Sequence, residues 1–453
     1  MKQNIPYSLS LLFVCCVLNG CAVLDNHHPL NPPMDIPEHW NAETITGNTF
    51  TKNNNFWEAF NDSQLNQLIA KALLTNNDLA IASLNLKAAK IANDESHTQS
   101  FLPDISTNDL SFKNGEWSNA SSTILLNYEI DLFGKLAAER SKTSWEMRAT
   151  QEDRQATALT LIGEVTDLYW DIACYEQTVL IYQNNIADTK KMVDLMHQKL
   201  TAGAVARLDV IATEKHLIDL TDSYQTIQSE LAKAHRKMAI LFNQAPQKLV
   251  SIKYASLEKT ALPDIQVDIP TNVLANRPDI RSAIYTLNST LKKARENPLL
   301  NNPILSLSGK LFEILANPMN AWSFATTLVL PKINWQATQQ KAKIEYEKNI
   351  LKYKKAVHTA LLELEDILSD RKQLQEKAKT HAESLALAFE KEKIAKARYL
   401  AGDTSLEDLL EQQTTKRSEE LKSIENRCKQ LKNAMQLYRA LGGGKFEWEK
   451  QHP

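Results

Sequence analysis

Apolar residues recur every seven positions through two long stretches of this chain. The first stretch contains Val165, Ile172, Val179, Ile186, Val193 and Leu200. In the second stretch, from Leu421 to Tyr438, spacings of three and four residues alternate. A strict seven-residue period is typical of helices that pack along a left-handed seam, so long paired helices are expected.

One isolated glycine interrupts each helical stretch. Gly203 and Gly402 lie in segments without proline, 104–245 and 332–452, and their positions differ by 199 (402 minus 203). Leu102-Pro103 and Asn302-Pro303 repeat at an offset of 200. Landmarks that recur at one spacing indicate an internal duplication. Each repeat is therefore predicted to contain a long helical hairpin whose tip is the glycine.

The period changes to two residues in segments 102–131 and 303–332. Between 124 and 130, apolar residues alternate with polar ones, which is the pattern of a strand with two different faces. Asn114-Gly115 predicts a hairpin turn in the first segment, and Asn317-Pro318 marks a turn in the second. Four strands cannot close a barrel, so several chains would have to share one if these strands cross a bilayer. A hairpin in water, packed on the helices, is the alternative.

The N-terminus has the features of a lipoprotein signal. Segment 1–20 contains Lys2 and an apolar run from Leu9 to Leu18, and Leu18-Asn19-Gly20-Cys21 is a lipobox. We expect Cys21 to carry lipid, and Ala22, by resemblance to lipoprotein sorting signals, favours the outer membrane. A plain secretory signal or a short membrane anchor is the alternative. Segment 21–60 is rich in Pro and Asn and is predicted to be an extended leader.

The remaining chain divides into two repeats and a connector. Repeat one spans 61–245 and begins with one helix, from Asp62 towards Gln99. The connector spans 246–277, repeat two spans 278–441, and 442–453 form a C-terminal tail. The predicted fold class is mainly α with β hairpins.

Composition excludes several classes of function. A net charge of -2 with 23% charged residues disfavours nucleic-acid binding. There is no CxxC, no HExxH and no set of nucleophile, base and orienter, so we expect no enzyme, cofactor or metal site. After processing, Cys174 and Cys428 would remain. A bridge between them is conceivable, but they occupy non-equivalent positions in the repeats, which favours two buried free thiols.

Four ordered motifs resemble those of one family. The chain resembles the outer-membrane factor lipoproteins of resistance-nodulation-division (RND) efflux systems, within the TolC-like channel family. The resemblance implies a homotrimer with a helical periplasmic tunnel, a shared twelve-stranded outer-membrane barrel, and coupling through a periplasmic adaptor to an inner-membrane RND pump. The motifs are Phe56-Trp57 with Leu65 and Ala72-Leu73, Tyr128 to Lys135, Leu274 to Ile280, and Leu437 to Gly444.

The resemblance also assigns a periplasmic gate at the hairpin tips. Its acidic positions fall at Asp209, Asp408 and Glu411, and its tyrosine at Tyr399. Three copies of Asp408 and Glu411 around a narrow lumen would favour cations, and conductance would change at mildly acidic pH. Solvated faces of helices are the alternative role for these acids.

An arginine that latches the hairpins in some relatives is replaced here by Thr404, and Arg207 is the candidate substitute. The rival to a passive efflux channel is a lipid-anchored coiled-coil tether or adaptor without a pore. The cargo does not follow from the sequence.

Overall fold

The computed structural model describes the helical repeats and part of the strands. The described residues are 34, 36–41, 55–99, 104–108, 112–113, 116–117, 123–130, 135–248, 257, 260–263, 265, 267, 270–295, 303–310, 322–328 and 335–443. The described secondary structure belongs to one compact unit, Ile36–Pro453. The signal segment, Cys21, the turns at Asn114-Gly115 and Asn317-Pro318, and the tail beyond residue 443 lie outside the described residues.

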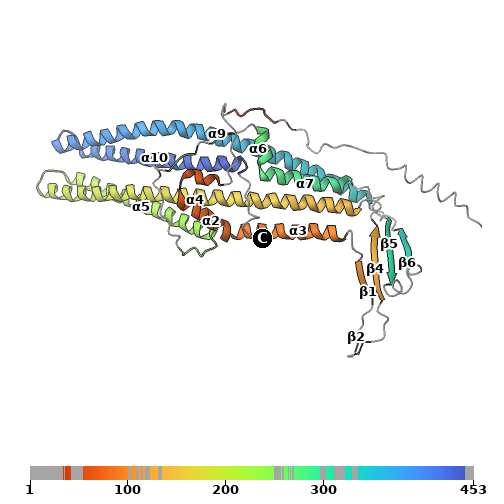
Figure 1. Cartoon of the computed structure of the whole chain (residues 1–453). Helices are drawn as coiled ribbons and strands as arrows, with labels where there is room; N and C mark the ends of the chain where they lie inside the picture. The colour runs from red at the N-terminus through yellow and green to blue at the C-terminus, as the bar shows by residue number, and fades with distance from the viewer. Residues whose placement is uncertain are drawn as a thin grey trace, which may run out of the picture. The chain divides into compact units, whose positions relative to one another are not determined.

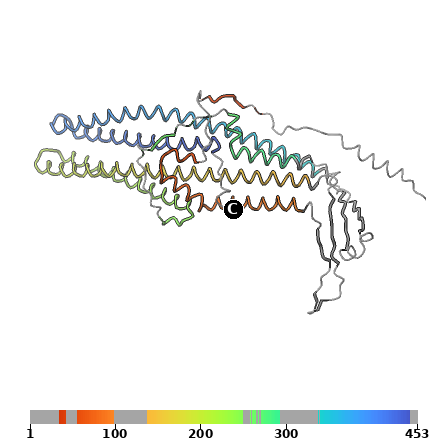
Figure 2. Tube along the Cα trace, in the orientation of Figure 1, coloured from red at the N-terminus to blue at the C-terminus, as the bar shows by residue number. Residues whose placement is uncertain are grey.

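The duplication is visible in helix lengths. Helices α4 (Lys135–Thr201) and α9 (Trp335–Ala401) each contain 67 residues, and α5 (Arg207–Leu241) and α10 (Leu406–Ala440) each contain 35. At about 1.5 Å per residue, α4 and α9 are each about 100 Å long. Each long helix packs along its shorter partner as a hairpin (Figure 1). Figure 2 traces both chain reversals.

Both reversals depend on left-handed glycine. Gly203 and Gly402 have φ angles of 71° and 77°, a conformation that costs an L-residue about 1–2 kcal/mol. The amides after the glycines donate back to the ends of the helices: Ala204 N lies 2.8 Å from Lys199 O, and Asp403 N lies 2.9 Å from Arg398 O. The predicted tips are thus the observed tips.

The prediction of one helix from Asp62 to Gln99 was wrong. Two helices occupy this segment, α2 (Ser63–Thr75) and α3 (Asn77–Gln99), and Asn76 between them is extended. The Asn76 side chain accepts hydrogen bonds from the backbone amides of Asp78 and Leu79, and so caps α3. An equivalent break lies at Arg277, between α6 (Pro270–Asn276) and α7 (Pro278–Arg295). Helix α6 falls within the predicted connector and occupies the place that α2 has in repeat one.

The strands form one antiparallel sheet that joins the repeats. Its order is β1-β4-β5-β6, from β1 (Asp104–Asn108), β4 (Thr123–Ile130), β5 (Pro303–Lys310) and β6 (Trp322–Leu328). Each repeat supplies two neighbouring strands, and β4 pairs with β5 across the repeats. A separate pair, β2 (Phe112–Lys113) with β3 (Glu116–Trp117), flanks the predicted turn at 114–115. In the described sheet, β1 and β6 are the edges.

One face of α4 forms the centre of the main hydrophobic core. Ile162, Val165, Tyr169, Trp170 and Ile172 are fully buried. Helices α2, α3, α5, α7 and α10 all contact α4. The Tyr169 hydroxyl donates to Asp62 Oδ2 at 2.5 Å, while Asp62 Oδ1 caps α2. The core also receives aromatic residues from the segment before α2: Trp40, Phe56, Trp57 and Phe60.

Cys174 and Cys428 form a disulfide, so the expectation of two free thiols was wrong. Their Cα atoms lie 6.5 Å apart, within the usual range of about 4.4–6.8 Å. Non-equivalence in the repeats did not prevent pairing, because α4 of one repeat packs against α10 of the other. The bond closes a sequence separation of 254 residues, which corresponds to about 5 kcal/mol in the chain-entropy model.

The two C-terminal sequence motifs meet in space. Arg277 donates to Asp279, to Glu363 at 2.8 Å and to the carbonyl of Ala440 at 3.0 Å. Burial lowers the pKa of Arg277, but the hydrogen bonds and charges of Asp279 and Glu363 outweigh it and raise this pKa above its ordinary value. Gly442 follows with a φ of 92°, and a Cβ there would lie 2.6 Å from the backbone oxygen of Asn276. Position 442, just after α10, therefore has room only for a residue without a side chain.

Gly442→Ala is expected to destabilise the protein more than Gly402→Ala. Both glycines have positive φ, but a Cβ at Gly402 would meet nothing within 4 Å. We expect a loss of about 1 kcal/mol at Gly402 and a further loss of about 1–3 kcal/mol at Gly442 from the backbone clash. Thermal unfolding of the purified variants measures this. Equal midpoints would show that the close approach at Asn276 has no energetic role.

Candidate functional site

The predicted gate residues gather where the two hairpins reverse. Met196, Val210 and Leu406, from α4, α5 and α10, form a small buried cluster, and Tyr399 from α9 packs against it half-buried. We call this apolar contact between the hairpins the tip cluster. Through the tip cluster, Tyr399 of the second hairpin contacts the first hairpin.

Two contacts of Tyr399 were not predicted. Its hydroxyl lies 3.6 Å from the sulfur of Met196, and the Lys199 ammonium lies 4.9 Å from the centre of its ring. Both partners belong to α4, so these are contacts between the repeats. The hydroxyl donates a hydrogen bond to the sulfur, which is a weak acceptor, and the ammonium is attracted by the face of the ring. The sequence showed no signal for these contacts, because Met196 is not a member of the seven-residue series from Val165 to Leu200.

Asp209 and Asp408 hold equivalent structural positions at the starts of α5 and α10. Asp209 Oδ2 accepts from the backbone amide of Ala206 at 3.0 Å. Asp408 Oδ2 accepts from Ser405 N at 3.3 Å, and Asp408 N donates to Ser405 Oγ at 3.1 Å. This reciprocal pair is a capping box, which satisfies amides that the helix itself cannot pair. Each acid therefore stabilises its own helix.

Hydrogen bonds keep Asp408 ionised. The Thr404 hydroxyl donates to Asp408 Oδ2 at 2.7 Å, and this bond, followed by those from Ser405, lowers the pKa of Asp408 below its ordinary value. The effect opposes the mutual repulsion that a ring of like charges would create. Within this chain, Asp408 thus stays charged at mildly acidic pH. Thr404, which replaces the latch arginine, is its main partner.

Within the described part of this chain, Arg207 pairs with its own hairpin and not with the second one. Its guanidinium lies 3.9 Å from Glu214 on the same helix and is 59% exposed. Glu214 also contacts His197 on α4 at 3.0 Å. On the second hairpin, Arg398 closes its own turn by donating to Asp403 at 2.8 Å. Arg398 was missed by the sequence reasoning, because a charge four residues before the tip gives no distinctive pattern.

Acidic residues line a groove between α5 and α10 at the tips. The groove encloses about 530 Å³, and Asp209, Glu407 and Glu411 supply its carboxylates. Its apolar lining comes from Leu208, Ala212, Leu406 and Leu410. Asp408 is exposed and does not line it. Asp209 and Glu411 therefore share one surface, while Asp408 lies about 60° away around α10.

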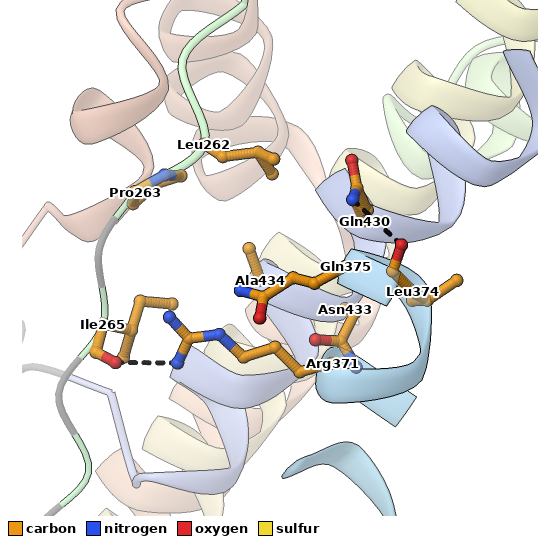
Figure 3. A pocket seen from close by; sticks show the side chains of 9 residues that line it. All are labelled: Leu262, Pro263, Ile265, Arg371, Leu374, Gln375, Gln430, Asn433 and Ala434. Atoms are coloured by element: carbon orange, nitrogen blue, oxygen red, sulfur yellow. Dashed lines mark hydrogen bonds between the residues drawn. The ribbon is translucent and has the colours of Figure 1, made fainter. Parts of the chain in front are cut away.

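A second cavity lies far from the tips, under the connector. Figure 3 shows Leu262, Pro263 and Ile265 facing side chains of α9 and α10. Arg371 donates to the carbonyl of Ile265 at 2.8 Å, and Gln430 donates to that of Leu374 at 3.2 Å. The cavity encloses about 50 Å³, enough for a few waters. It is a packing feature of the connector rather than a site for a solute.

Two features are absent from the described residues. Among them, no group of three His, Cys, Asp or Glu side chains is placed to hold a metal. None of the helices in this part of the chain is both long and apolar enough to span a bilayer.

The chain matches one family model over both repeats. The model describes the outer membrane efflux protein family and matches residues 68–237 and 269–443. The matched segments contain both tips and every predicted gate residue.

Curated relatives match along nearly their whole length. The chain is 24% identical to toxin and drug export protein A of Aggregatibacter actinomycetemcomitans, covering 95% of this chain and 96% of that protein. It is also 24% identical to the toluene efflux pump outer membrane protein TtgC of Pseudomonas putida, covering 97% and 96%.

Solved structures share the fold. The outer-membrane channel OprN superimposes with a TM-score of 0.77 at 23% identity, covering 91% of this chain and 98% of that one. The outer membrane protein VceC of Vibrio cholerae gives 0.74 at 19% identity, covering 87% and 100%. The duplicated helical hairpins are therefore the fold of outer-membrane channels.

Thr404→Val is expected to raise the pKa of Asp408. The lowered pKa means that Asp408 contributes stability above the ordinary aspartate range, and that this contribution is lost as pH falls through its folded pKa. NMR of protein labelled at the aspartate carboxyl carbon follows this titration, with Asp408→Asn assigning the signal. Thr414→Val is the matched control, because Thr414 donates only to a backbone carbonyl. An unchanged midpoint in Thr404→Val would refute the role of the hydroxyl.

Proposed function

The chain belongs to the outer membrane efflux protein family, and on this premise we propose that three copies form a passive duct through which solutes leave the periplasm. The observation that carries the proposal is the sheet with edge strands β1 and β6 in its described part. Unpaired strand edges are not stable in lipid, so a neighbouring chain must pair with them. Three four-stranded sheets give a shared twelve-stranded barrel.

Exposed apolar residues support the trimer. On α3, Ile81, Leu84 and Ile91 are each more than half exposed, and on α9 Ile344, Leu351 and Leu362 are each about two-thirds exposed. Leu84 and Ile91, like Ile344 and Leu351, are seven residues apart and so share a helix face. Such apolar stripes on one chain indicate surfaces that another chain covers. A non-conducting tether would need neither these stripes nor the sheet.

The position of the chain in a pump follows from the same proposal. A passive duct contains no energy source, so an inner-membrane pump of the RND class and a periplasmic adaptor would supply the driving force. Toluene appears in the name of one relative, and pyoverdine in another, pyoverdine export outer membrane protein OpmQ of Pseudomonas putida, 26% identical over the whole of both chains. We propose an organic solute as cargo on the strength of these names, and no catalytic activity.

The periplasmic mouth is proposed to lie at the tips. Around a three-fold axis, Asp408, Glu411 and Asp209 would place acidic side chains at the entrance, and the tip cluster would hold each pair of hairpins together. Acidic entrances concentrate cations in the lumen. Arg207 is exposed at the start of α5, where it is a candidate for a contact with a neighbouring chain.

Neutralising the gate acids is expected to reduce cation selectivity. Native protein should purify as a trimer and form cation-selective pores in planar bilayers. In the Asp408→Asn/Glu411→Gln variant, the ratio of cation to anion permeability should fall several-fold at 0.1 M salt. The difference should shrink at 1 M, where the Debye length is about 3 Å.

The matched control is Asp188→Asn/Glu425→Gln, which removes two exposed acids that pair with neighbouring lysines. Equal selectivity in all three proteins would exclude these acids from the gate, and a monomer without conductance would exclude the duct.

The N-terminus provides an independent test of location. We propose that cleavage after Gly20 leaves Cys21 as a lipidated N-terminus, and that the leader connects this anchor to the core. The predicted extended leader ends before residue 60, because Phe56–Phe60 form a short 3-10 helix whose aromatic side chains are buried. Mass spectrometry of the mature protein should find Cys21 with diacylglycerol. Cys21→Ala should remain unprocessed, while Cys16→Ala, within the signal, should be processed normally. An unmodified Cys21 would contradict the lipid anchor.

A further inference from the structure

The disulfide lies at one height along both helical hairpins. Cys174 is 29 residues before Gly203, and Cys428 is 26 residues after Gly402. At about 1.5 Å per helical residue, both cysteines are about 40 Å from their tips. One turn further from the tips, Lys432 of α10 donates to Asp171 of α4. Covalent and ionic links between the repeats therefore lie together at this height.

Further from the tips than the disulfide and the Lys432–Asp171 pair, the two hairpins share a continuous hydrophobic core. Val165, Tyr169 and Ile172 of α4 and Leu431, Met435 and Tyr438 of α10 are all fully buried in the same cluster. We call this part the body. Separating the hairpins here would expose large apolar side chains, at about 1.5–3 kcal/mol for each.

On the tip side, the contact between the hairpins is sparse. We call segments 175–229 and 376–427 the arms. In these segments, all of which the structure describes, one hydrogen bond joins the two hairpins, from Tyr399 to Met196. Residues of the seven-residue seam that are buried in the body, such as Val165 and Ile172, give way to half-buried ones, such as Val179 and Ile186.

The middle of the arms holds a poorly satisfied cation. Arg417 of α10 lies near His216 of α5 and Tyr182 of α4, and its Nη1 is buried without a hydrogen-bond partner. Burial lowers the pKa of Arg417, and burial followed by the charge of Arg417 lowers that of His216. An unpaired buried donor costs about 1–3 kcal/mol, so this contact does not hold the arms together.

We propose that the Cys174–Cys428 disulfide is a covalent pivot that confines separation of the hairpins to the arms, and so sets how far the periplasmic mouth opens. The effect on the width of the mouth rests on the proposed duct function. The confinement of hairpin separation to the arms does not. Breaking the tip cluster frees the arms, while the bond keeps the body closed. The tips then move as the ends of levers about 40 Å long.

The chemistry of the bond makes the pivot permanent rather than switchable. A cysteine thiolate attacks the disulfide of an oxidised dithiol protein, and the second thiolate displaces that protein, which leaves as a dithiol with two electrons and two protons. Cys428 is only 6% exposed in the folded chain. The burial of Cys428 keeps bulky dithiol proteins away from the closed bond, while the half-buried Cys174 leaves it within reach of a small reductant at high concentration.

The test compares the native trimer with Cys174→Ser/Cys428→Ser, which leaves no unpaired thiol. Hydrogen exchange read by mass spectrometry should show fast exchange in the arms and slow exchange in the body, with the boundary near residues 174 and 428. In the variant, we expect exchange at 165–173 and 429–435 to rise at least several-fold. Single-channel recordings should show a several-fold higher open probability. An unchanged boundary together with unchanged gating would overturn the pivot.

Reduction of the assembled native trimer provides the same comparison without a folding step. After reduction and alkylation, mass spectrometry identifies molecules in which both thiols are modified, and their exchange is measured. If the double variant fails to assemble, this comparison decides. A native protein that does not conduct would refute the duct, while the exchange boundary would still test the pivot.

Discussion

Burial of one face of α4, between residues 158 and 173, is the constraint on which the rest of the structure depends. This face is contacted by helices of both repeats and by the aromatic segment before α2. Tyr169 connects it to the cap of α2, and Asp171 and Cys174 connect it to α10. Because these contacts converge on one helix, the two repeats pack as one body rather than as independent hairpins.

The same helix changes character along its length, and this gradient connects the fold with its function. One seven-residue seam runs from the body into the arm, but its side chains pass from fully buried to half-buried. Contact between the repeats weakens in parallel and ends in the small tip cluster. A channel that must hold a fixed position in a membrane while its mouth changes width needs this combination of a rigid body and weakly joined ends.

The sequence predicted those features that local chemistry decides. The tips followed from Gly203 and Gly402, since left-handed backbone is accessible to glycine at little cost. The duplication followed from landmarks that recur at one offset, and the long helices and strand pairs followed from periods of seven and two residues. The start of α10 could also have been predicted, because Ser405 and Asp408 have capping-box spacing.

The features that were missed depend on partners distant in sequence or on side chains that override a periodic pattern. The Asn76 cap interrupts a helix that its apolar stripe alone would continue. The Cys174–Cys428 bond requires knowledge of which helices of the two repeats are neighbours. The contact of Tyr399 with Met196 joins residues 203 positions apart. For the gate, the sequence placed the acids at the tips but did not separate Asp408, which caps α10, from Glu411, which faces a groove.

The central claim is that several copies of this chain complete one channel. An electron cryo-microscopy map of the full-length protein in lipid nanodiscs tests it most directly. The account predicts three copies around one axis, with β1 of each chain paired to β6 of the next and the long helices surrounding a continuous lumen. A single chain, or an assembly in which these strand edges stay unpaired and the helices close into a solid bundle, would contradict it.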